Sequence, residues 1–232
     1  MAEIKTPKGS PSIDMTPMVD LAFLLVTFFM LAATFRTDEP VEVSIPSSIG
    51  DKEIPEKTLV LVTVDKGGRI FFSCTGEEVR KKVVTQMAAK YKVPLSEDNI
   101  KEFVRITSIG CSMGELPQYL SLDGEGRKNY RKQDANFVGI PSDSMHNELK
   151  DWINFANREM LDYGKKMFEE ESAKQGKGQA PLKPEDYKPK FVLKAAMDAE
   201  YVRVKTAIET FRDLNLNNLN FVTSQEAAAV VK

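Results

Sequence analysis

The sequence predicts an α+β fold in which one apolar N-terminal helix precedes a small domain of a β-hairpin, a helix and a βαβ unit. Three observations indicate this fold. Uncharged, mainly apolar residues run from Leu21 to Phe35, an alternating hairpin pattern covers residues 58–73, and a strand–helix–strand pattern covers residues 191–223. A mainly helical segment separates the last two. With 232 residues, of which 42% are hydrophobic and 28% charged, the chain is long enough for one or two compact domains.

The apolar run is long enough to cross a bilayer only if it is extended backwards. Residues 21–35 are uncharged, and adding residues 16–20 gives 20 positions, about the length of a hydrocarbon core at 1.5 Å per residue. A cleaved signal peptide is an alternative, but the leader is long, contains two prolines and is partly acidic. A buried core helix is another, but the apolar residues cover every side of the helix rather than one stripe. We therefore predict a transmembrane helix over residues 16–36.

Asp20 is the acidic residue at the edge of this run. Thr16 and Pro17 form a helix start, because a threonine can accept hydrogen bonds from free N–H groups and proline is tolerated at the first position. Asp20, Thr27 and Thr34 are seven residues apart and share one narrow side of the helix. One interpretation places Asp20 at headgroup level, where it complements the helix dipole. The threonine stripe favours the other, a buried carboxylate that gains and loses a proton.

The hairpin and the helix after it have clear local patterns. In "TLVLVTVDKGGRIFFS", from Thr58 to Ser73, two alternating strands flank the turn at residues 66–68. The next segment, residues 76–92, predicts an amphipathic helix with Val79, Val83, Met87 and Tyr91 on one side. Near the C-terminus, residues 191–195 and 219–223 predict two strands around a helix.

The residues Ile13-Asp14-Met15-Thr16-Pro17-Met18-Val19-Asp20, followed by a single span, resemble the signature of the ExbD/TolR family of subunits driven by the proton motive force. The resemblance covers residues 13–91 and 190–224. It implies that Asp20 is the proton carrier. We expect no cofactor. It further implies the inner membrane of a Gram-negative bacterium, with the N-terminus cytoplasmic and the C-terminal domain periplasmic. The implied partners are an ExbB-like multi-span ring, a TonB-like transducer, the lipid bilayer and a second copy of the chain.

With that resemblance, the chain divides into five predicted parts. They are a cytoplasmic tail (1–15), the transmembrane helix (16–36), a periplasmic linker (37–57), an ExbD-like periplasmic domain (58–92 and 190–232) and a helical insertion (93–189). The linker contains a short extended strand at residues 41–45, which could exchange between two protomers.

The insertion departs from the family pattern. It contains a long amphipathic stripe of residues, opened by Ser142 or Ser144 as a helix cap: Met145, Leu149, Trp152, Ala156, Met160, Tyr163 and Met167. Residues 174–190 are rich in glycine and proline and predict a mobile return linker. Cys74 follows the hairpin and Cys111 lies in the insertion, so a disulfide between them would join the two parts in an oxidising compartment.

Other chemistry is weakly supported. The formal net charge of −2 and pI near 5.7 give no basic field for nucleic acid. Gly110-Cys111-Ser112-Met113-Gly114 fits the G-x-S-x-G pattern of a hydrolase, but Pro117 follows too closely for the expected helix. The single histidine, His146, has no second His or Cys at metal-ligand spacing. We therefore predict neither an enzyme nor a metal site.

The functional prediction is a motor subunit that energises a TonB-type transducer for outer-membrane active transport. A TolR-like role in envelope maintenance is the alternative within the family. A protein of another class, a single-pass anchored periplasmic binding module, is the alternative outside it; there Asp20 is only a helix-end charge and the insertion is the active part.

Overall fold

The structure is a computed structural model that describes residues 15–32, 56–133, 139–143, 146–174, 182–196, 198–216 and 218–223. The chain forms two compact units, residues 1–38 and residues 39–232. The first unit contains the helix α1 (Thr16–Ala32), and the second contains the described strands and the remaining helices. The predicted strand at residues 41–45 lies outside the described residues.

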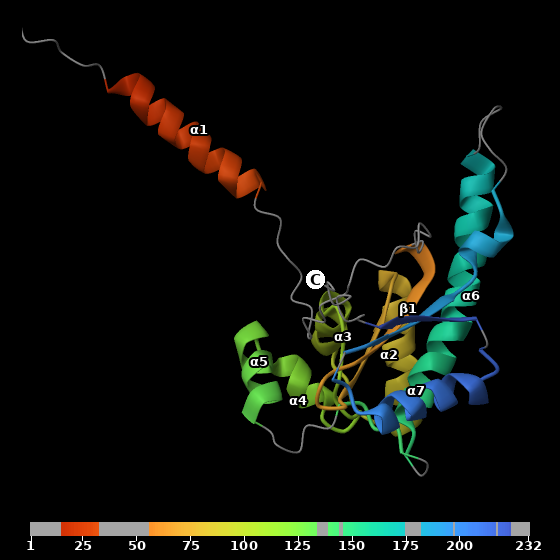
Figure 1. Ribbon diagram of the computed structural model, residues 1–232. Helices are drawn as coiled ribbons and strands as arrows, with labels where there is room; N and C mark the ends of the chain where they lie inside the picture. The colour runs from red at the N-terminus through yellow and green to blue at the C-terminus, as the bar shows by residue number, and fades with distance from the viewer. Residues whose placement is uncertain are drawn as a thin grey trace, which may run out of the picture. The chain divides into compact units, whose positions relative to one another are not determined.

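A mixed four-stranded sheet organises the second unit (Figure 1). Its strands are β1 (Leu59–Val64), β2 (Ile70–Cys74), β3 (Lys190–Ala195) and β4 (Leu219–Thr223), in the order β2-β1-β3-β4. β1 and β2 form the predicted antiparallel hairpin, while β3 is parallel to both β1 and β4. The predicted α+β class is therefore confirmed.

The hairpin turn is held by a buried carboxylate. Asp65 is 2% exposed, and its Oδ1 accepts hydrogen bonds from the backbone N–H groups of Gly67 at 2.9 Å and Arg69 at 2.8 Å. Its second oxygen pairs with the Arg69 guanidinium. A short acidic side chain that caps its own turn in this way fixes the strand register.

One face of the sheet carries the hydrophobic core. Val60, Val62 and Val64 of β1 are each fully buried, and strand alternation places them on the same face. Their register neighbours on β2 and β3 share that face and are buried as well. The helices α2 (Glu77–Tyr91), α6 (Glu148–Lys174) and α7 (Tyr201–Asp213) contribute their buried side chains to the same cluster.

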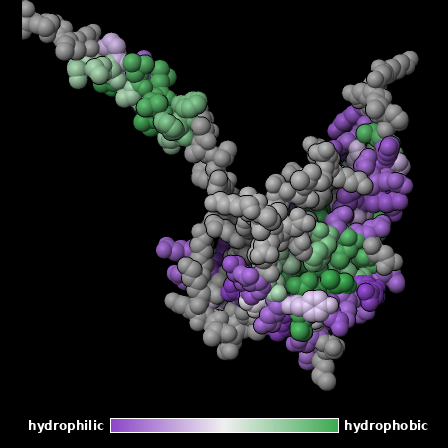
Figure 2. All heavy atoms as spheres, in the orientation of Figure 1, coloured by the Kyte–Doolittle hydropathy of each residue, from purple (hydrophilic) through white to green (hydrophobic). Residues whose placement is uncertain are grey.

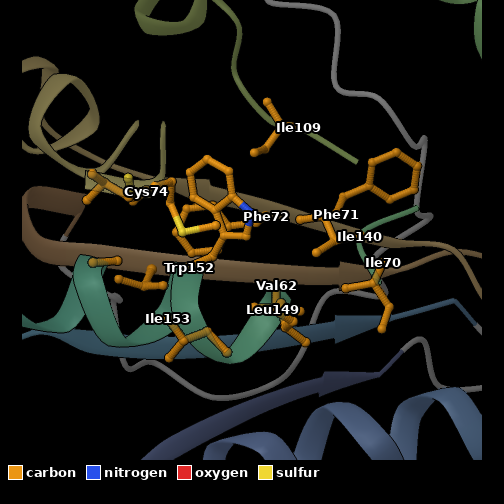
Figure 3. Packing of buried hydrophobic residues seen from close by; sticks show 14 of the residues in the cluster. Val62, Ile70, Phe71, Phe72, Cys74, Ile109, Ile140, Leu149, Trp152 and Ile153 are labelled. Carbon is orange, nitrogen blue, oxygen red and sulfur yellow. The ribbon is translucent and has the colours of Figure 1, made fainter. Parts of the chain in front are cut away.

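The segment between α2 and β3 is part of this core. It contains α3 (Glu97–Arg105), α4 (Leu116–Ser121), α5 (Gly124–Gln133), α6 and the 3₁₀ turn η2 (Pro184–Tyr187). Trp152 of α6 lies against Phe72 of β2 (Figure 3), with ring centroids 5.5 Å apart. It also stacks on Phe103 of α3, with ring centroids 5.8 Å apart. The predicted long helix is therefore present, and it fills the centre of the domain.

The same segment also covers the outer edge of β2. Ile109 forms an antiparallel bridge with Phe72, through hydrogen bonds of 2.8 and 2.9 Å in both directions. Gly139 forms a parallel bridge with Ile70, and the Ile140 N–H donates to the Ile70 carbonyl at 2.9 Å. These pairings satisfy backbone groups that an exposed edge strand would leave open to other chains.

Two local predictions in this segment need correction. α6 begins at Glu148, and its cap is Asn147, whose side-chain oxygen accepts from the Lys150 N–H at 2.8 Å, rather than Ser142 or Ser144. The predicted return linker is partly ordered, because η2 packs on α6 and Tyr187 is only 7% exposed. A neighbouring cap residue, Asn147, decides where α6 begins. A contact distant in sequence, between η2 and α6, orders part of the return segment.

Candidate functional site

The helix α1 starts one position earlier than the sequence predicted, at Thr16 rather than Pro17. The Val19 N–H donates to the Met15 carbonyl at 3.1 Å, so Thr16 and Pro17 occupy the first two helical positions. Proline is tolerated there because the first N–H groups of a helix have no intrahelical partner. Asp20 follows as the fifth residue of the helix and is the only charged residue in it.

The surface of α1 is apolar on all sides, apart from Asp20 and the polar start of the helix at Thr16 and Pro17. Figure 2 shows this helix as green over most of the visible face. The exposed apolar side chains, each more than half exposed, are Met15, Met18, Val19, Leu21, Phe23, Leu24, Leu25, Val26, Phe28, Phe29 and Met30. An apolar surface of this size is unfavourable in water and indicates contact with a membrane or with another protein.

Thr27 satisfies its own hydroxyl group. Its Oγ1 donates to the Leu24 carbonyl at 2.9 Å, within the same helix. Seven residues separate it from Asp20, so the two lie on one side of α1. Thr34, the third residue of the predicted stripe, lies outside the described residues. In the part of this stripe that the structure describes, Asp20 is the one ionisable side chain.

Among the helices that the structure describes, none is long and apolar enough to cross a membrane.

Cys74 and Cys111 are both buried and are not bonded to each other. The predicted disulfide is therefore not present in this structure.

Burial also makes Cys74 a poor nucleophile. It is 5% exposed, and burial raises the pKa of its thiol to about 12, although the nearby Arg80 acts in the opposite direction. The thiolate is the reactive form of cysteine. Cys74 is therefore a packing residue of the sheet.

The hydrolase-like motif has a packing explanation. A Cβ atom at Gly110 would lie 2.2 Å from the Phe71 ring, so glycine is required where this segment crosses the sheet. Ser112 closes a turn, since its carbonyl accepts from the Glu115 and Leu116 N–H groups. His146 is exposed at the loop before α6. In the described part of the chain no three His, Cys, Asp or Glu side chains gather as metal ligands.

Glu148 is a titratable residue that the sequence did not single out. Its Oε2 accepts from the Met113 N–H at 2.9 Å and so fixes the loop before α4 to the start of α6. Burial raises the pKa of this carboxyl group; the nearby Asp151 and Glu115 carboxylates add to the rise, while the Met113 hydrogen bond opposes it. In sequence, an acidic residue in a first helical turn indicates only a favourable dipole interaction.

Comparison with known proteins supports the resemblance in the N-terminal half. The family model described as "Biopolymer transport protein ExbD/TolR" matches residues 7–130, or 124 of the 232 residues. The match includes Asp20, the hairpin and α2, and it continues past residue 93, the predicted start of the insertion. No curated protein and no solved structure gives a significant match. Since the matched region exceeds half of the chain, the chain belongs to the ExbD/TolR family of biopolymer transport proteins.

Proposed function

We propose that this chain is an ExbD-type subunit of an inner-membrane motor and that Asp20 is the residue that carries the proton. One observation carries the proposal: Asp20 is the only charged side chain on a helix whose other large side chains are apolar and exposed. An ionisable group in such a setting is expensive to keep in hydrocarbon and is a functional residue by default. Membership of the ExbD/TolR family, with its energy-transducing role, supports this assignment.

The energetics fit a carboxylate switch. Moving one proton across the membrane potential releases about 2.3 kcal/mol per 100 mV. Placing an ionised carboxylate at the centre of a lipid-facing helix costs about 2.5–3.5 kcal/mol on insertion scales, an upper bound for Asp20, which lies nearer the start of α1. The free energy released by the proton and the cost of the ionised carboxylate are of the same order. Protonation of Asp20 can therefore decide whether its side of α1 faces lipid or a polar partner.

We propose that residues 16–36 form the membrane span, with residues 1–15 in the cytoplasm and the sheet-containing unit in the periplasm. The described helix ends at Ala32, and the sequence stays uncharged as far as Phe35. Lys5 and Lys8 on the N-terminal side support this orientation, although Arg36 lies close to the other end.

One helix cannot provide a polar path for a proton by itself, because the backbone groups along its middle are already hydrogen-bonded within the helix and lipid offers no partner. We therefore infer an ExbB-like ring of membrane helices around α1, a homodimer of this chain, and a TonB-like transducer that delivers the work to an outer-membrane transporter. A TolR-type role in envelope maintenance is the alternative within the family.

Substitution of Asp20 by Asn tests the proposal. The amide has nearly the same shape but cannot release a proton at neutral pH. In cells that depend on this chain, proton-motive-force-driven uptake should be lost in Asp20→Asn while the protein still reaches the membrane. Asp14→Asn is the matched control, since it removes a neighbouring carboxylate outside the apolar run. Full uptake in Asp20→Asn, without a multi-span partner in the purified complex, would instead favour the anchored binding module.

A further inference from the structure

The chain enters the sheet of the second unit through a closely packed junction. Thr58, the residue before β1, is fully buried. Its hydroxyl donates to the Lys188 carbonyl at 3.0 Å, just before β3 begins. On the other side, the Leu59 N–H donates to the Thr75 hydroxyl at 2.9 Å, just after β2 ends. The start of β1 is thus tied to both neighbouring strands.

The helix α6 closes this junction through a glycine. A Cβ atom at Gly164 would lie 2.0 Å from the Tyr187 carbonyl oxygen and 3.7 Å from the Thr58 methyl group. Gly164 itself is buried in the middle of a 27-residue helix, where glycine costs roughly 1 kcal/mol relative to alanine. The close approach of η2 to α6 explains why glycine occupies this position.

Polar and aromatic side chains make further contacts between Lys57, η2 and α6. Lys57 Nζ lies 2.7 Å from Glu171 Oε1 and 5.9 Å from the centre of the Tyr187 ring. The Tyr187 hydroxyl donates to the other oxygen of Glu171, and the Phe168 ring meets Tyr187 edge-on at 5.5 Å. In Figure 1 the light-blue turn that precedes β3 lies beside the upper half of α6. Lys57 is therefore held by two elements of the insertion.

We propose that α6 and η2 form a clamp that fixes the N-terminal end of β1, so that a pull on the chain before Lys57 is resisted by the insertion as well as by the sheet. A β-strand that is peeled away from its neighbours opens one hydrogen-bonded pair at a time, starting at the pulled end. At this junction, opening the first pair also requires separating Thr58 from Lys188, and Lys57 from Glu171 and the Tyr187 ring. The inference stands on the second unit alone and does not depend on the role of Asp20.

Gly164→Ala tests the clamp, because the clamp predicts a loss of stability at the junction, whereas helix propensity alone predicts no loss or a gain. Alanine favours an isolated helix, so without the clamp the substitution should leave α6 and the sheet as stable as before or more so. With the clamp, the new methyl group must displace η2, since it would overlap a backbone oxygen. Gly124→Ala is the matched control, because Gly124 is also helical and nothing lies within 4 Å of its added Cβ.

The measurement is amide hydrogen exchange on the full chain in detergent, with trypsin cleavage after Lys57 as a second reading. We expect exchange at residues 58–61 to become at least tenfold faster in Gly164→Ala and cleavage after Lys57 to accelerate, with α2 unchanged. Equal acceleration in all elements would overturn the proposal, because it would show general loss of packing. Unchanged exchange at residues 58–61 would overturn it as well.

A second pair of variants tests the Lys57–Glu171 ion pair independently of Gly164. Glu171→Gln removes the charge that holds Lys57, whereas Asp198→Asn removes the charge opposite Lys66 at the other end of β1. We expect faster cleavage after Lys57 in Glu171→Gln and none of this effect in Asp198→Asn. The same cleavage rate in both variants would exclude Glu171 from the clamp.

Discussion

Phe103 is the residue through which the dependence of the sheet on the insertion can be measured. It belongs to α3, is 2% exposed, and stacks on Trp152 with an interplanar angle of 11°. Its ring also lies 5.7 Å from the Arg80 guanidinium of α2. Phe103→Ala removes a ring that joins α2, α3 and α6, while the backbone carbonyl that accepts from Arg80 is kept.

The expected loss of unfolding free energy is about 3–5 kcal/mol, the usual cost of Phe→Ala in a well-packed core. For a domain of this size, urea lowers the unfolding free energy by about 2 kcal/mol per molar. The urea midpoint should therefore fall by about 1.5–2.5 M. Lys101→Ala is the control on the same helix, because Lys101 is exposed and its ion pair with Asp98 is worth little.

Two probes report on the two parts of the unit in the full chain. Trp152 is the only tryptophan of the chain, so its fluorescence reports on the packing of α6 against α3 and β2. Cys74 lies in β2, and pulse alkylation followed by peptide mapping reports on the sheet. If the insertion and the sheet share one core, both midpoints fall together in Phe103→Ala. A shift of the Trp152 transition with an unchanged Cys74 transition would refute this reasoning and show that the insertion unfolds alone.

Two further predictions follow from titratable groups. Burial raises the pKa of Glu148, so the folded chain binds this proton more tightly than the unfolded chain and its contribution to stability falls as pH rises above about 4.5. Glu148→Gln keeps an acceptor for Met113 and removes this slope; its urea midpoint relative to the parent should therefore rise between pH 4.5 and 7, and a constant difference would contradict the assignment. Because burial raises the pKa of Cys74 to about 12, iodoacetamide at pH 8 should modify Cys74 only as the chain unfolds. Rapid alkylation of the native chain, seen by peptide mass, would show that the strand opens locally.

The elements that could be predicted from sequence are those specified by local patterns. The hairpin, α2 and the strand–helix–strand unit each show a regular period over enough residues to identify them. The long helix α6 was predicted from its stripe for the same reason. The start of α1 was predicted to within one residue, because threonine followed by proline is informative by itself.

The elements that could not be predicted depend on contacts distant in sequence. Ile109 pairs with β2 at a single position, and one bridge leaves no periodic pattern. Asn147 caps α6 although two serines nearby are equally suitable by residue type. Gly164 offered the one usable signal, since a glycine inside a strong helical stripe often marks close backbone approach. Asp20 was identifiable because a charge in an apolar run stands out without any tertiary information.

The way the segment between α2 and β3 is built bears on where the function lies. It leaves the domain after α2 and returns before β3, so the sheet order β2-β1-β3-β4 does not depend on it. Nevertheless, α6 supplies Leu149, Trp152 and Ile153, all fully buried, to the core face of that sheet. Each such side chain contributes about 1.5–3 kcal/mol, comparable in sum to the whole stability of a typical domain, about 5–15 kcal/mol. A segment used for binding would be expected to present its apolar residues outward, whereas this one buries these apolar side chains in the core of its own domain. That arrangement supports the proposal that α1 with Asp20, rather than the segment between α2 and β3, performs the transport function.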